Sequence, residues 1–350
     1  MVSDTVLINE TASRAINRIA EYCKKEKPMV AIWCITYNQA NYIRKTLDGF
    51  INQKTSFRFV AIVHDDASTD GTSEVIKEYA NRFPEIIFPI LEIENQYSKK
   101  NGSIGAIIRT AAAATGAKYY AECEGDDYWL KTDKLQRQFN ILESHSECTI
   151  AVNRVQKVDK SGFCLNSTIP PAESFKEGEF TLGDLVNHEF LKGKWTFQTS
   201  SFFFREEMVQ LNLHNKKTVF KDFPYGDMPL LLTCLLNGNG YYIDEIMGCY
   251  TVLSGGYNSS MRSNKKIASQ NYLKVGKALK AFNEFTRYQY NKELKRAIRR
   301  YQFNAEVVAD KKLNLRLFLP KYRHFYRIAL LKFAEALMPG IYSKLKNSRH

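Results

Sequence analysis

The chain lacks the segments that would place it across a membrane or send it out of the cell. None of its 350 residues belong to an apolar run that approaches the roughly 20 residues a membrane-spanning helix requires. The N-terminus, MVSDTVLINE, has neither a basic start nor an apolar core, so it does not resemble a secretory signal. We therefore expect a cytoplasmic protein.

The cysteines show no regular spacing. The seven cysteines are an odd number, are scattered along the chain and form no CxxC pair. This pattern argues against a zinc or disulfide framework and favours reduced thiols packed as small apolar side chains. His64, His145 and His188 show no paired spacing, and we assign them no role.

The first three quarters of the chain carry no net positive charge. From Lys265 to the end there are 21 Lys/Arg and 5 Asp/Glu, a net of +16. The preceding 264 residues hold 29 basic and 32 acidic residues, a net of −3. A nucleic-acid-binding protein carries a basic stripe near its recognition element, so this distribution argues against one.

Strand and helix patterns alternate four times in the first part of the chain, which predicts a parallel sheet with crossover helices. A short leading helix comes first, over 10–25. The expected strands are 28–36, 57–66, 86–92 and 118–127, and the expected helices are 40–53, 72–83, 104–115 and 134–144. Beyond residue 150 the alternation weakens. There, 149–158, 195–205 and 240–252 read as strands, 228–238 as a buried helix, and 265–350 as helical.

Polar clusters follow three of these strands, where ligands of parallel sheets gather. The densest is AECEGDDYW, with Glu124, Asp126 and Asp127 within four residues. Clustered like charges repel, and a hard divalent cation with a diphosphate would account for them. A solvated acidic turn before a helix is the alternative, and the four residues alone do not decide between the two.

The other two clusters are Asp65-Asp66 after the second strand and Thr36-Tyr37-Asn38 after the first. Asp70 and Thr72 suit helix capping, but two adjacent acids exceed what a cap needs. A carboxylate there suits the N–H of a uracil-type base or a ribose hydroxyl.

The order of these clusters resembles family 2 glycosyltransferases of the GT-A fold. The resemblance rests on ITYNQANYIRKTLDGFINQ, VAIVHDDASTDGT and YAECEGDDYWLKTDKLQRQ, and it covers roughly residues 28–255. It implies an α/β fold: a Rossmann-like, mostly parallel sheet flanked by helices, here with a C-terminal helical extension. Together with the residue patterns on either side of it, the resemblance divides the chain into a helical lead (1–27), a catalytic domain (28–264, with nucleotide and acceptor halves that meet at 145) and a basic helical region (265–350).

The resemblance implies a role for each matching position. Thr36, Tyr37 and Asn38 would border the nucleotide, and Asp66 would bind the base or ribose. Glu124, Asp126 and Asp127 match the acidic D-x-D-D element that holds the diphosphate through Mn²⁺ or Mg²⁺. Glu124 stands where the family has aspartate, which makes Asp126 and Asp127 the preferred metal ligands.

The second half of the chain would supply the base and the acceptor contacts. FPYGDMPLLLTCLLNG resembles the family segment that carries the general base, which points to Asp227, with Asp222 as the fallback. Capping of the following helix is the alternative for Asp227. Gln198, Thr199 and Ser200 would border the acceptor, and Arg262 would neutralise a phosphate.

The function these roles imply is inverting transfer of a sugar from a nucleoside diphosphate sugar, with UDP as the nucleotide, to a hydroxyl of a glycan or lipid-linked acceptor in cell-surface polysaccharide biosynthesis. The alternatives are a nucleotidyltransferase and a non-catalytic nucleotide- or nucleic-acid-binding protein. A nucleotidyltransferase would carry a glycine-rich basic loop where this chain has TYNQANY, and an oxidoreductase would carry GxGxxG there.

The basic C-terminal region interleaves cations with aromatic and aliphatic residues. In its last helix Phe325, Ala329, Lys332 and Phe333 fall at helical spacing. A basic amphipathic helix can lie in the interface of an anionic membrane, and it can also pack on the rest of the protein. We expect peripheral contact with the inner face of the cell membrane.

Overall fold

The computed structural model describes residues 7–187, 197–253, 264–309 and 315–337. The chain divides into two compact units, which are described separately below. The first unit comprises Met1–Thr181, Thr196–Asn212 and Leu230–Val252, and the second comprises Leu182–Trp195, Leu213–Pro229 and Leu253–His350.

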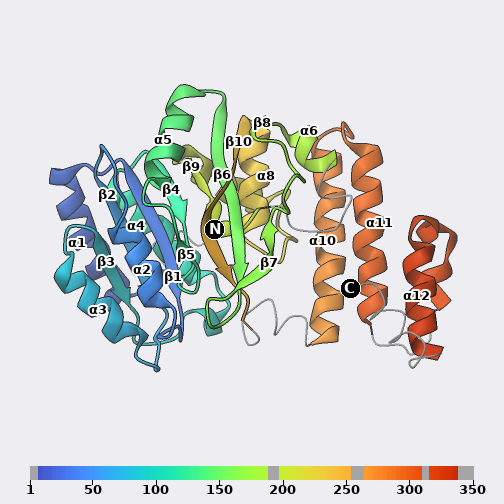
Figure 1. The fold of residues 1–350 in the computed structure, drawn as a ribbon, viewed down its shortest axis with the longest axis horizontal. Coiled ribbons are helices and arrows are strands. Elements are labelled where there is room, and N and C mark those ends of the chain that lie inside the picture. The colour runs from blue at the N-terminus through green and yellow to red at the C-terminus, as the bar shows by residue number, and fades with distance from the viewer. Residues whose placement is uncertain (1–6, 188–196, 254–263, 310–314, 338–350) are drawn as a thin grey trace. The chain divides into compact units, whose positions relative to one another are not determined.

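The first unit is built on one sheet (Figure 1). Its strands are β1 (Val30–Thr36), β2 (Phe59–Asp65), β3 (Ile87–Leu91), β4 (Tyr119–Glu122), β5 (Tyr128–Trp129), β6 (Cys148–Val158), β7 (Cys164–Ile169), β8 (Gly178–Phe180), β9 (Phe203–Arg205) and β10 (Asn239–Thr251). The order is β3-β2-β1-β4-β9-β6-β10-β5, with β7 paired to β6 and β8 to β10. The run β3-β2-β1-β4 is parallel, and so is the pair β6 and β10. The antiparallel strand β9 joins these two parallel parts.

The helices complete both units. In the first are α1 (Glu10–Glu26), α2 (Ile43–Ile51), α3 (Thr72–Arg82), η2 (Tyr97–Lys99), α4 (Ser103–Thr115), α5 (Lys134–Ser144) and η4 (Thr199–Ser201). In the second are α6 (Leu182–Leu185), α10 (Lys265–Phe285), α11 (Asn291–Val308), η5 (Leu315–Phe318), η6 (Pro320–Phe325) and α12 (Tyr326–Leu337). The helices α7 (Glu207–Lys217) and α8 (Asp227–Asn237) each begin in one unit and end in the other.

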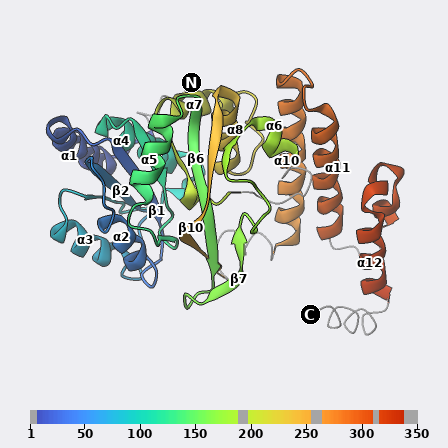
Figure 2. The same cartoon turned by 45° about the horizontal axis from the view of Figure 1, so that its top comes forward.

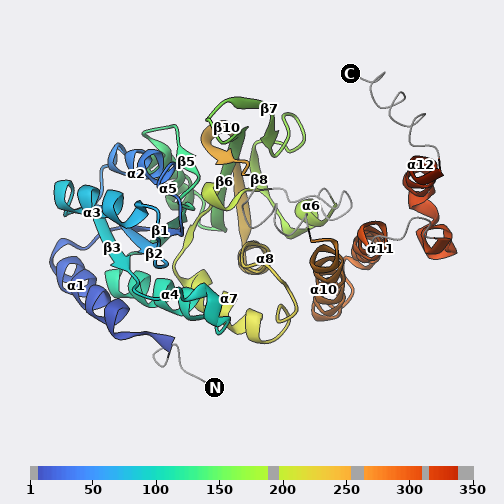
Figure 3. The ribbon, with the colours of Figure 1, turned by 90° about the horizontal axis from the view of Figure 1, so that it is seen from below.

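Helices cover both faces of the parallel strands, which explains why those strands are mainly apolar. Figure 3 shows α2, α3 and α5 on one side of the sheet and α1 and α4 on the other. Every residue of β2 is buried, as expected for a strand between two helical layers. The main core fills the α2-α3-α5 side, where Ile32, Val63, Leu47 and Leu135 pack together.

The second unit is helical among its described residues. The helices α10 and α11 lie side by side (Figure 2), and a smaller core joins α11 to the segment that follows it. That core consists of Phe303, Leu317, Tyr322, Phe325 and Ala329. Within the described residues, no helix combines the length and apolarity needed to cross a membrane.

The α/β class, the flanking helices and the helical C-terminal extension are confirmed. The expected alternation of strand and helix is present over α1 to α5, with boundaries shifted by a few residues. The second half differs in detail, because the strand expected over 195–205 is only β9, preceded by the 3₁₀ turn η4. The strands β3, β2, β1 and β4 are parallel as expected, as is the pair β6 and β10, whereas β9 runs antiparallel between these two parts.

Candidate active site at the carboxyl ends of the strands

The three polar clusters meet at one edge of the sheet. Strand β1 lies between β2 and β4 and is parallel to both, so their carboxyl ends are neighbours. The amide of Asp66 donates to the carbonyl of Thr36 at 3.0 Å, and the amide of Gly125 donates to the carbonyl of Ile35 at 3.1 Å. The loops that carry Asp66 and Asp126 therefore flank the end of β1 on either side.

A glycine allows the acidic loop to lie directly on the end of β1. A Cβ atom at Gly125 would stand 2.5 Å from Oε1 of Gln39 and 2.6 Å from both Cβ and Oγ1 of Thr36. The hydroxyl of Thr46 then donates to the carbonyls of Gly125 and Asp127, at 2.9 Å and 2.6 Å. These contacts fix the backbone on both sides of Asp126.

The three acids of the cluster differ in exposure. Glu124 is exposed, Asp126 is half-buried and Asp127 is fully buried. The carboxylate of Asp127 accepts hydrogen bonds from the amide of Thr251 at 3.0 Å and from Nε2 of Gln198 at 3.4 Å. Both of its oxygens are thus engaged by the protein, whereas the half-buried position of Asp126 suits contact with a ligand.

Burial controls the electrostatics of this pair. Burial raises the pKa of Asp127 well above its usual range, the adjacent charge of Asp126 raises it further, and the Thr251 amide opposes the rise. Burial also raises the pKa of Asp126, against a hydrogen bond from the side chain of Gln39. Two neighbouring carboxyls that resist ionisation in this way fit a hard cation, which would stabilise their charged forms.

The acid pair after β2 is engaged by the protein as well. Asp66 is 2% exposed, and its carboxylate accepts hydrogen bonds from the amides of Gln96 at 2.6 Å and Tyr97 at 3.1 Å. Asp65 accepts from the hydroxyls of Ser68 and Ser73. The carboxylate of Asp66 therefore orients the segment after β3, which carries Tyr97.

Residues 31–209 match the family described as Glycosyl transferase family 2. The chain belongs to this family. The matched range contains the ends of β1, β2 and β4 and the turn η4, so the site described above lies within it.

Two relatives illustrate the range of similarity. An uncharacterised protein of Mycobacterium tuberculosis H37Rv is 39% identical over 142 residues, which is 41% of this chain and 39% of that protein. The chain thus matches well under half of the length of these mycobacterial relatives. The putative teichuronic acid biosynthesis glycosyltransferase TuaG of Bacillus subtilis is 25% identical over 240 residues, 68% of this chain and 83% of that protein.

Solved structures show weaker similarity. The Staphylococcus aureus TarS 1–349 structure, in complex with UDP, has 16% identity and a TM-score of 0.48, covering 88% of this chain and 89% of that one. The mannosyltransferase PcManGT from Pyrobaculum calidifontis, in complex with GDP-Man and Mn²⁺, has 14% identity and a TM-score of 0.49, covering 95% and 96%.

In this family 2 chain, two tyrosines border the ends of β1 and β3. Tyr37 is 48% exposed and Tyr97 is 62% exposed, so both rings are accessible at the edge that carries the motifs. Asn38 adopts a positive φ of 51° and joins the two neighbouring loops. Its amide donates to Oγ of Ser68 at 2.8 Å, and its Oδ1 accepts from the amide of Thr69 at 2.9 Å.

The residues expected at the acceptor lie on the turn η4. Gln198 reaches Asp127, and the side chain of Ser200 lowers the pKa of that carboxyl in opposition to its burial. The carbonyl of Ser200 accepts from Nε1 of Trp129 at 2.9 Å, and Thr199 is half-buried. Gln198 and Ser200 are therefore brought together with the acidic cluster.

The proposed bases lie outside the matched range, in the second unit. Asp227 is half-buried at the start of α8, and its Oδ1 accepts from the amide of Met228 at 2.8 Å. Burial raises its pKa, and Lys216 opposes the rise. Asp222 pairs with Lys277 at 3.1 Å. Arg262 falls outside the described residues.

Sequence reasoning missed several residues that shape the site. Gln39 accepts a hydrogen bond from the hydroxyl of Thr36 and donates one to Asp126. The amide of Thr251 donates to Asp127, and the amide of Tyr97 donates to Asp66. Gln39 lies directly after the TYN element, so its proximity to Thr36 was open to inference. Thr251 is distant in sequence, and only the sheet brings it to Asp127.

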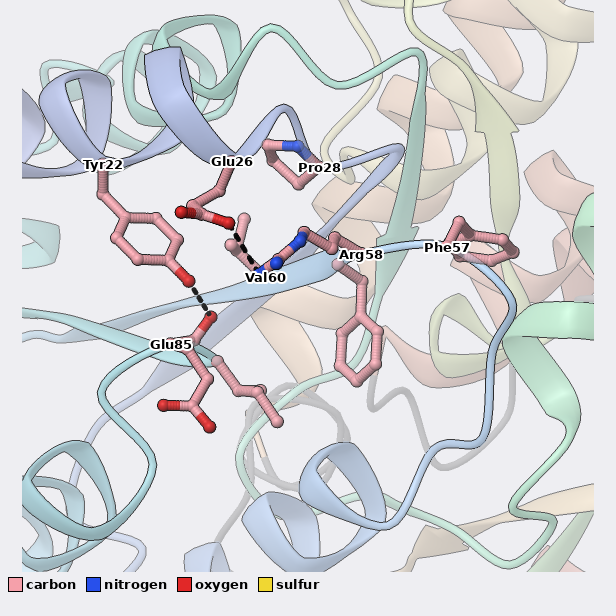
Figure 4. Close-up of a pocket in the computed structure, with 9 residues that line it drawn as sticks. Tyr22, Glu26, Pro28, Phe57, Arg58, Val60 and Glu85 are labelled. Carbon is pink, nitrogen blue, oxygen red and sulfur yellow. Dashed lines mark hydrogen bonds and ion pairs between the residues drawn. The ribbon is translucent and has the colours of Figure 1, made fainter.

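A separate pocket lies at the amino ends of the parallel strands (Figure 4). It has a volume of about 130 Å³ and lies beside the start of β2. Glu26 pairs with Arg58 at 2.6 Å across it, and the hydroxyl of Tyr22 donates to the carbonyl of Glu85 at 3.3 Å. Only Val60, the first residue of VAIVHDDASTDGT, belongs to the three motifs, and it lies at the opposite end of β2 from Asp65, so the pocket is not part of the candidate active site.

Proposed function

We propose that the protein is an inverting glycosyltransferase that moves a sugar from a nucleoside diphosphate sugar, with UDP as the nucleotide, to a hydroxyl of a glycan or lipid-linked acceptor. The observation that carries the proposal is the convergence of the Asp66 and Asp126 loops on the end of β1, within a family 2 chain. The name of the relative TuaG supports a place in cell-surface polysaccharide biosynthesis.

Asp126 is the proposed principal ligand of a divalent cation, Mn²⁺ or Mg²⁺. The oxygens of Asp127 already accept hydrogen bonds from Thr251 and Gln198, so Asp127 would support the site by orientation and charge. When bound, the cation would offset the negative charge of the departing diphosphate. Glu124, exposed on the same loop, would contribute charge at the rim of the site.

The nucleotide would lie along the ends of β1 and β2. Tyr37 and Tyr97 offer exposed ring faces for a base, and Thr36 and Asn38 hold the loop that carries Tyr37. Asp66 would act through the segment it orients, with its remaining lone pairs available to a base or ribose. Gln198, Thr199 and Ser200 would border the transferred sugar and the acceptor.

Asp227 is the proposed general base. It would accept the proton of the acceptor hydroxyl as that oxygen bonds to the anomeric carbon. The bond between the anomeric carbon and the diphosphate oxygen breaks in the same step, and the nucleoside diphosphate leaves with the electron pair. Attack from the face opposite the leaving group inverts the anomeric configuration, and no covalent enzyme intermediate is needed.

The experiment that tests this proposal is a panel of nucleotide sugars screened for metal-dependent release of the nucleoside diphosphate. We expect the wild type to release it from one class of donor in Mn²⁺ or Mg²⁺ and not in EDTA. The Asp133→Asn variant serves as the control for loss of the Asp126 carboxylate and should release the nucleoside diphosphate as the wild type does. Asp133 is exposed and makes no capping hydrogen bond. Metal-independent release, or none from any donor in the presence of diverse acceptor glycans, would refute the proposal.

We further propose that the segment 315–337 contacts an anionic membrane surface. Its buried side chains, Phe325 and Ala329, pack toward α11, while Leu315, Leu319, Leu330 and Leu331 are exposed. Exposed cations accompany these leucines at Lys321, Arg323, Arg327 and Lys332. Apolar side chains flanked by cations suit the interface of an anionic bilayer, and they would hold the enzyme near a lipid-linked acceptor.

A further inference from the structure

Lys134, at the start of α5, is the most deeply buried cationic side chain near the site. It is 0% exposed, and no carboxylate pairs with it among the residues that the structure describes. Burial lowers its pKa to about 7, while the thiol of Cys123 opposes that shift. A buried ammonium without a carboxylate is costly, and the lowered pKa means that its contacts offset only part of that cost.

Two neutral groups surround the ammonium of Lys134. Nζ donates to Oε1 of Gln138 at 2.7 Å, one helical turn further along α5. Nζ also stands 4.2 Å from the centre of the Trp129 ring, within the range of a cation–π contact. The lysine therefore fixes the orientation of two side chains that come from different elements, α5 and β5.

Both of these side chains donate to consecutive carbonyls of one turn. Nε1 of Trp129 donates to the carbonyl of Ser200 at 2.9 Å, and Nε2 of Gln138 donates to the carbonyl of Ser201 at 2.9 Å. The same turn carries Gln198, whose amide reaches Asp127. A continuous chain of contacts thus runs from Lys134 to the acidic cluster.

We propose that Lys134 is a positioning residue for sugar transfer: its ammonium orients Trp129 and Gln138, which hold residues 198–201 against Asp127. This inference rests on the proposed glycosyltransferase function. The chain of contacts reaches the acidic cluster at Asp127, through the 3.4 Å hydrogen bond from Gln198, and it touches neither Asp126 nor the loops after β1 and β2. Lys134 should therefore govern the transfer step and leave nucleotide binding intact.

The test compares Lys134→Met with Lys131→Met, a matched control whose lysine is partly exposed and paired with Glu245 at 2.6 Å. Methionine keeps most of the buried volume and removes the charge, so the variant should fold. We expect Lys134→Met to lower kcat about 10- to 100-fold, the range that misplaced reacting groups cost, with the Kd for UDP within about 2-fold of the wild type.

Trp129→Phe and Gln138→Leu each remove one donor to the turn and should lower kcat in the same way. The kcat of the Lys134→Met/Gln138→Leu double variant should be at most about 2-fold below that of the poorer single variant. The losses in kcat are not additive when two residues act through the same chain of contacts. Additive losses would contradict a shared path through the turn.

Hydrogen–deuterium exchange gives a readout that does not depend on turnover. In Lys134→Met, the amides of Ser201 and Phe202, which close the turn by donating to the carbonyls of Gln198 and Thr199, should exchange about 10-fold faster. Exchange at the Asn38 and Asp66 loops should be unchanged. Unchanged exchange at the turn, or faster exchange spread evenly over α5 and the sheet, would overturn the proposal. If the wild type transfers no sugar, the proposed function fails, while the exchange result still decides the role of Lys134.

Discussion

At the scale of single residues, the most constrained position of the site has no functional group. Gly125 is the point at which the acidic loop crosses the end of β1, and Thr36 occupies the space that a side chain would need. The adjacent Asp126 depends on this close approach for its place beside Gln39. The position of the Asp126 carboxylate thus depends on the absence of a side chain at the preceding residue, Gly125.

Gly125→Ala should therefore damage binding as well as stability. The added Cβ would stand 2.6 Å from the Cβ of Thr36. That atom is bonded to the backbone, so a rotation of the Thr36 side chain cannot remove the clash. We expect a loss of about 1–3 kcal/mol in the free energy of unfolding and at least a roughly 10-fold weaker metal-dependent affinity for UDP. Denaturant unfolding and calorimetry measure both.

Gly276→Ala is the control for this substitution. Gly276 lies inside α10, where an added Cβ would meet its nearest neighbours at 3.8 Å, an ordinary contact. Alanine there should leave stability unchanged or raise it by up to about 1 kcal/mol, since alanine favours a helix over glycine. Wild-type stability and UDP affinity in Gly125→Ala would contradict the packing account.

The proposed role of Asp227 as the general base predicts how the reaction rate depends on pH. A general base must be ionised, so activity is lost as the pH falls through its pKa. Burial raises that pKa above the usual 3.8, which moves the acid limb of the kcat/KM profile to higher pH than an exposed aspartate would give. Asp227→Asn should retain UDP binding and lose about 100-fold or more in kcat.

The pH profile and the variant together can contradict this role. A profile without an acid limb above 3.8, or an Asp227→Asn variant with wild-type kcat, would show that Asp227 only caps α8. The fallback base, Asp222, forms an ion pair with Lys277 at 3.1 Å.

At the scale of the elements, the sequence was most informative where the chain alternates strand and helix. The buried apolar run VAIWCIT forms β1, and the helix expected over 104–115 is α4, which ends at Gly116 in a left-handed conformation. The convergence of Asp66 and Asp126 followed from the parallel order of β2, β1 and β4. These features depend on local patterns, which a single sequence contains.

The details that the sequence did not reveal depend on long-range contacts. Asp66 was expected to bind the base or ribose, and the sequence did not reveal that its carboxylate also accepts hydrogen bonds from the amides of Gln96 and Tyr97, about 30 residues away in the chain. The turn η4 was expected to be strand, because its apolar and hydroxyl residues suit a strand. Contacts from Trp129 and Gln138 impose the turn instead.

The exposed leucines of α12 predict how the protein binds to membrane vesicles. Leu330 and Leu331 are exposed beside cations, and each apolar side chain that enters a bilayer interface contributes about 1.5–3 kcal/mol when fully buried. Leu330→Ser/Leu331→Ser should lower co-sedimentation with phosphatidylglycerol-containing vesicles at least about 10-fold, and removal of residues 315–350 should lower it further.

Two controls isolate the surface of α12. Leu211→Ser alters an exposed leucine of α7 and should leave vesicle binding unchanged. Vesicles of phosphatidylcholine alone should bind the wild type weakly, because the cations then have no anionic partner. Equal co-sedimentation of the wild type and the double variant would exclude α12 as the contact.

At the scale of the whole molecule, charge and chemistry are distributed between different parts of the chain. The first 264 residues carry a net charge of −3 and hold the acidic cluster, whereas the residues from Lys265 onward carry +16. This division suits an enzyme that concentrates a cation and a nucleotide at one place and approaches an anionic surface with another.

The central claim is that Asp126 belongs to a cation-dependent nucleotide site at the end of β1. Calorimetric titration of UDP into the wild type and Asp126→Ala, each with Mn²⁺ and with EDTA, tests it most directly. The account predicts binding by the wild type in Mn²⁺ only, and none by Asp126→Ala in either condition. Equal affinity of the folded Asp126→Ala variant and the wild type for UDP in Mn²⁺ would contradict it.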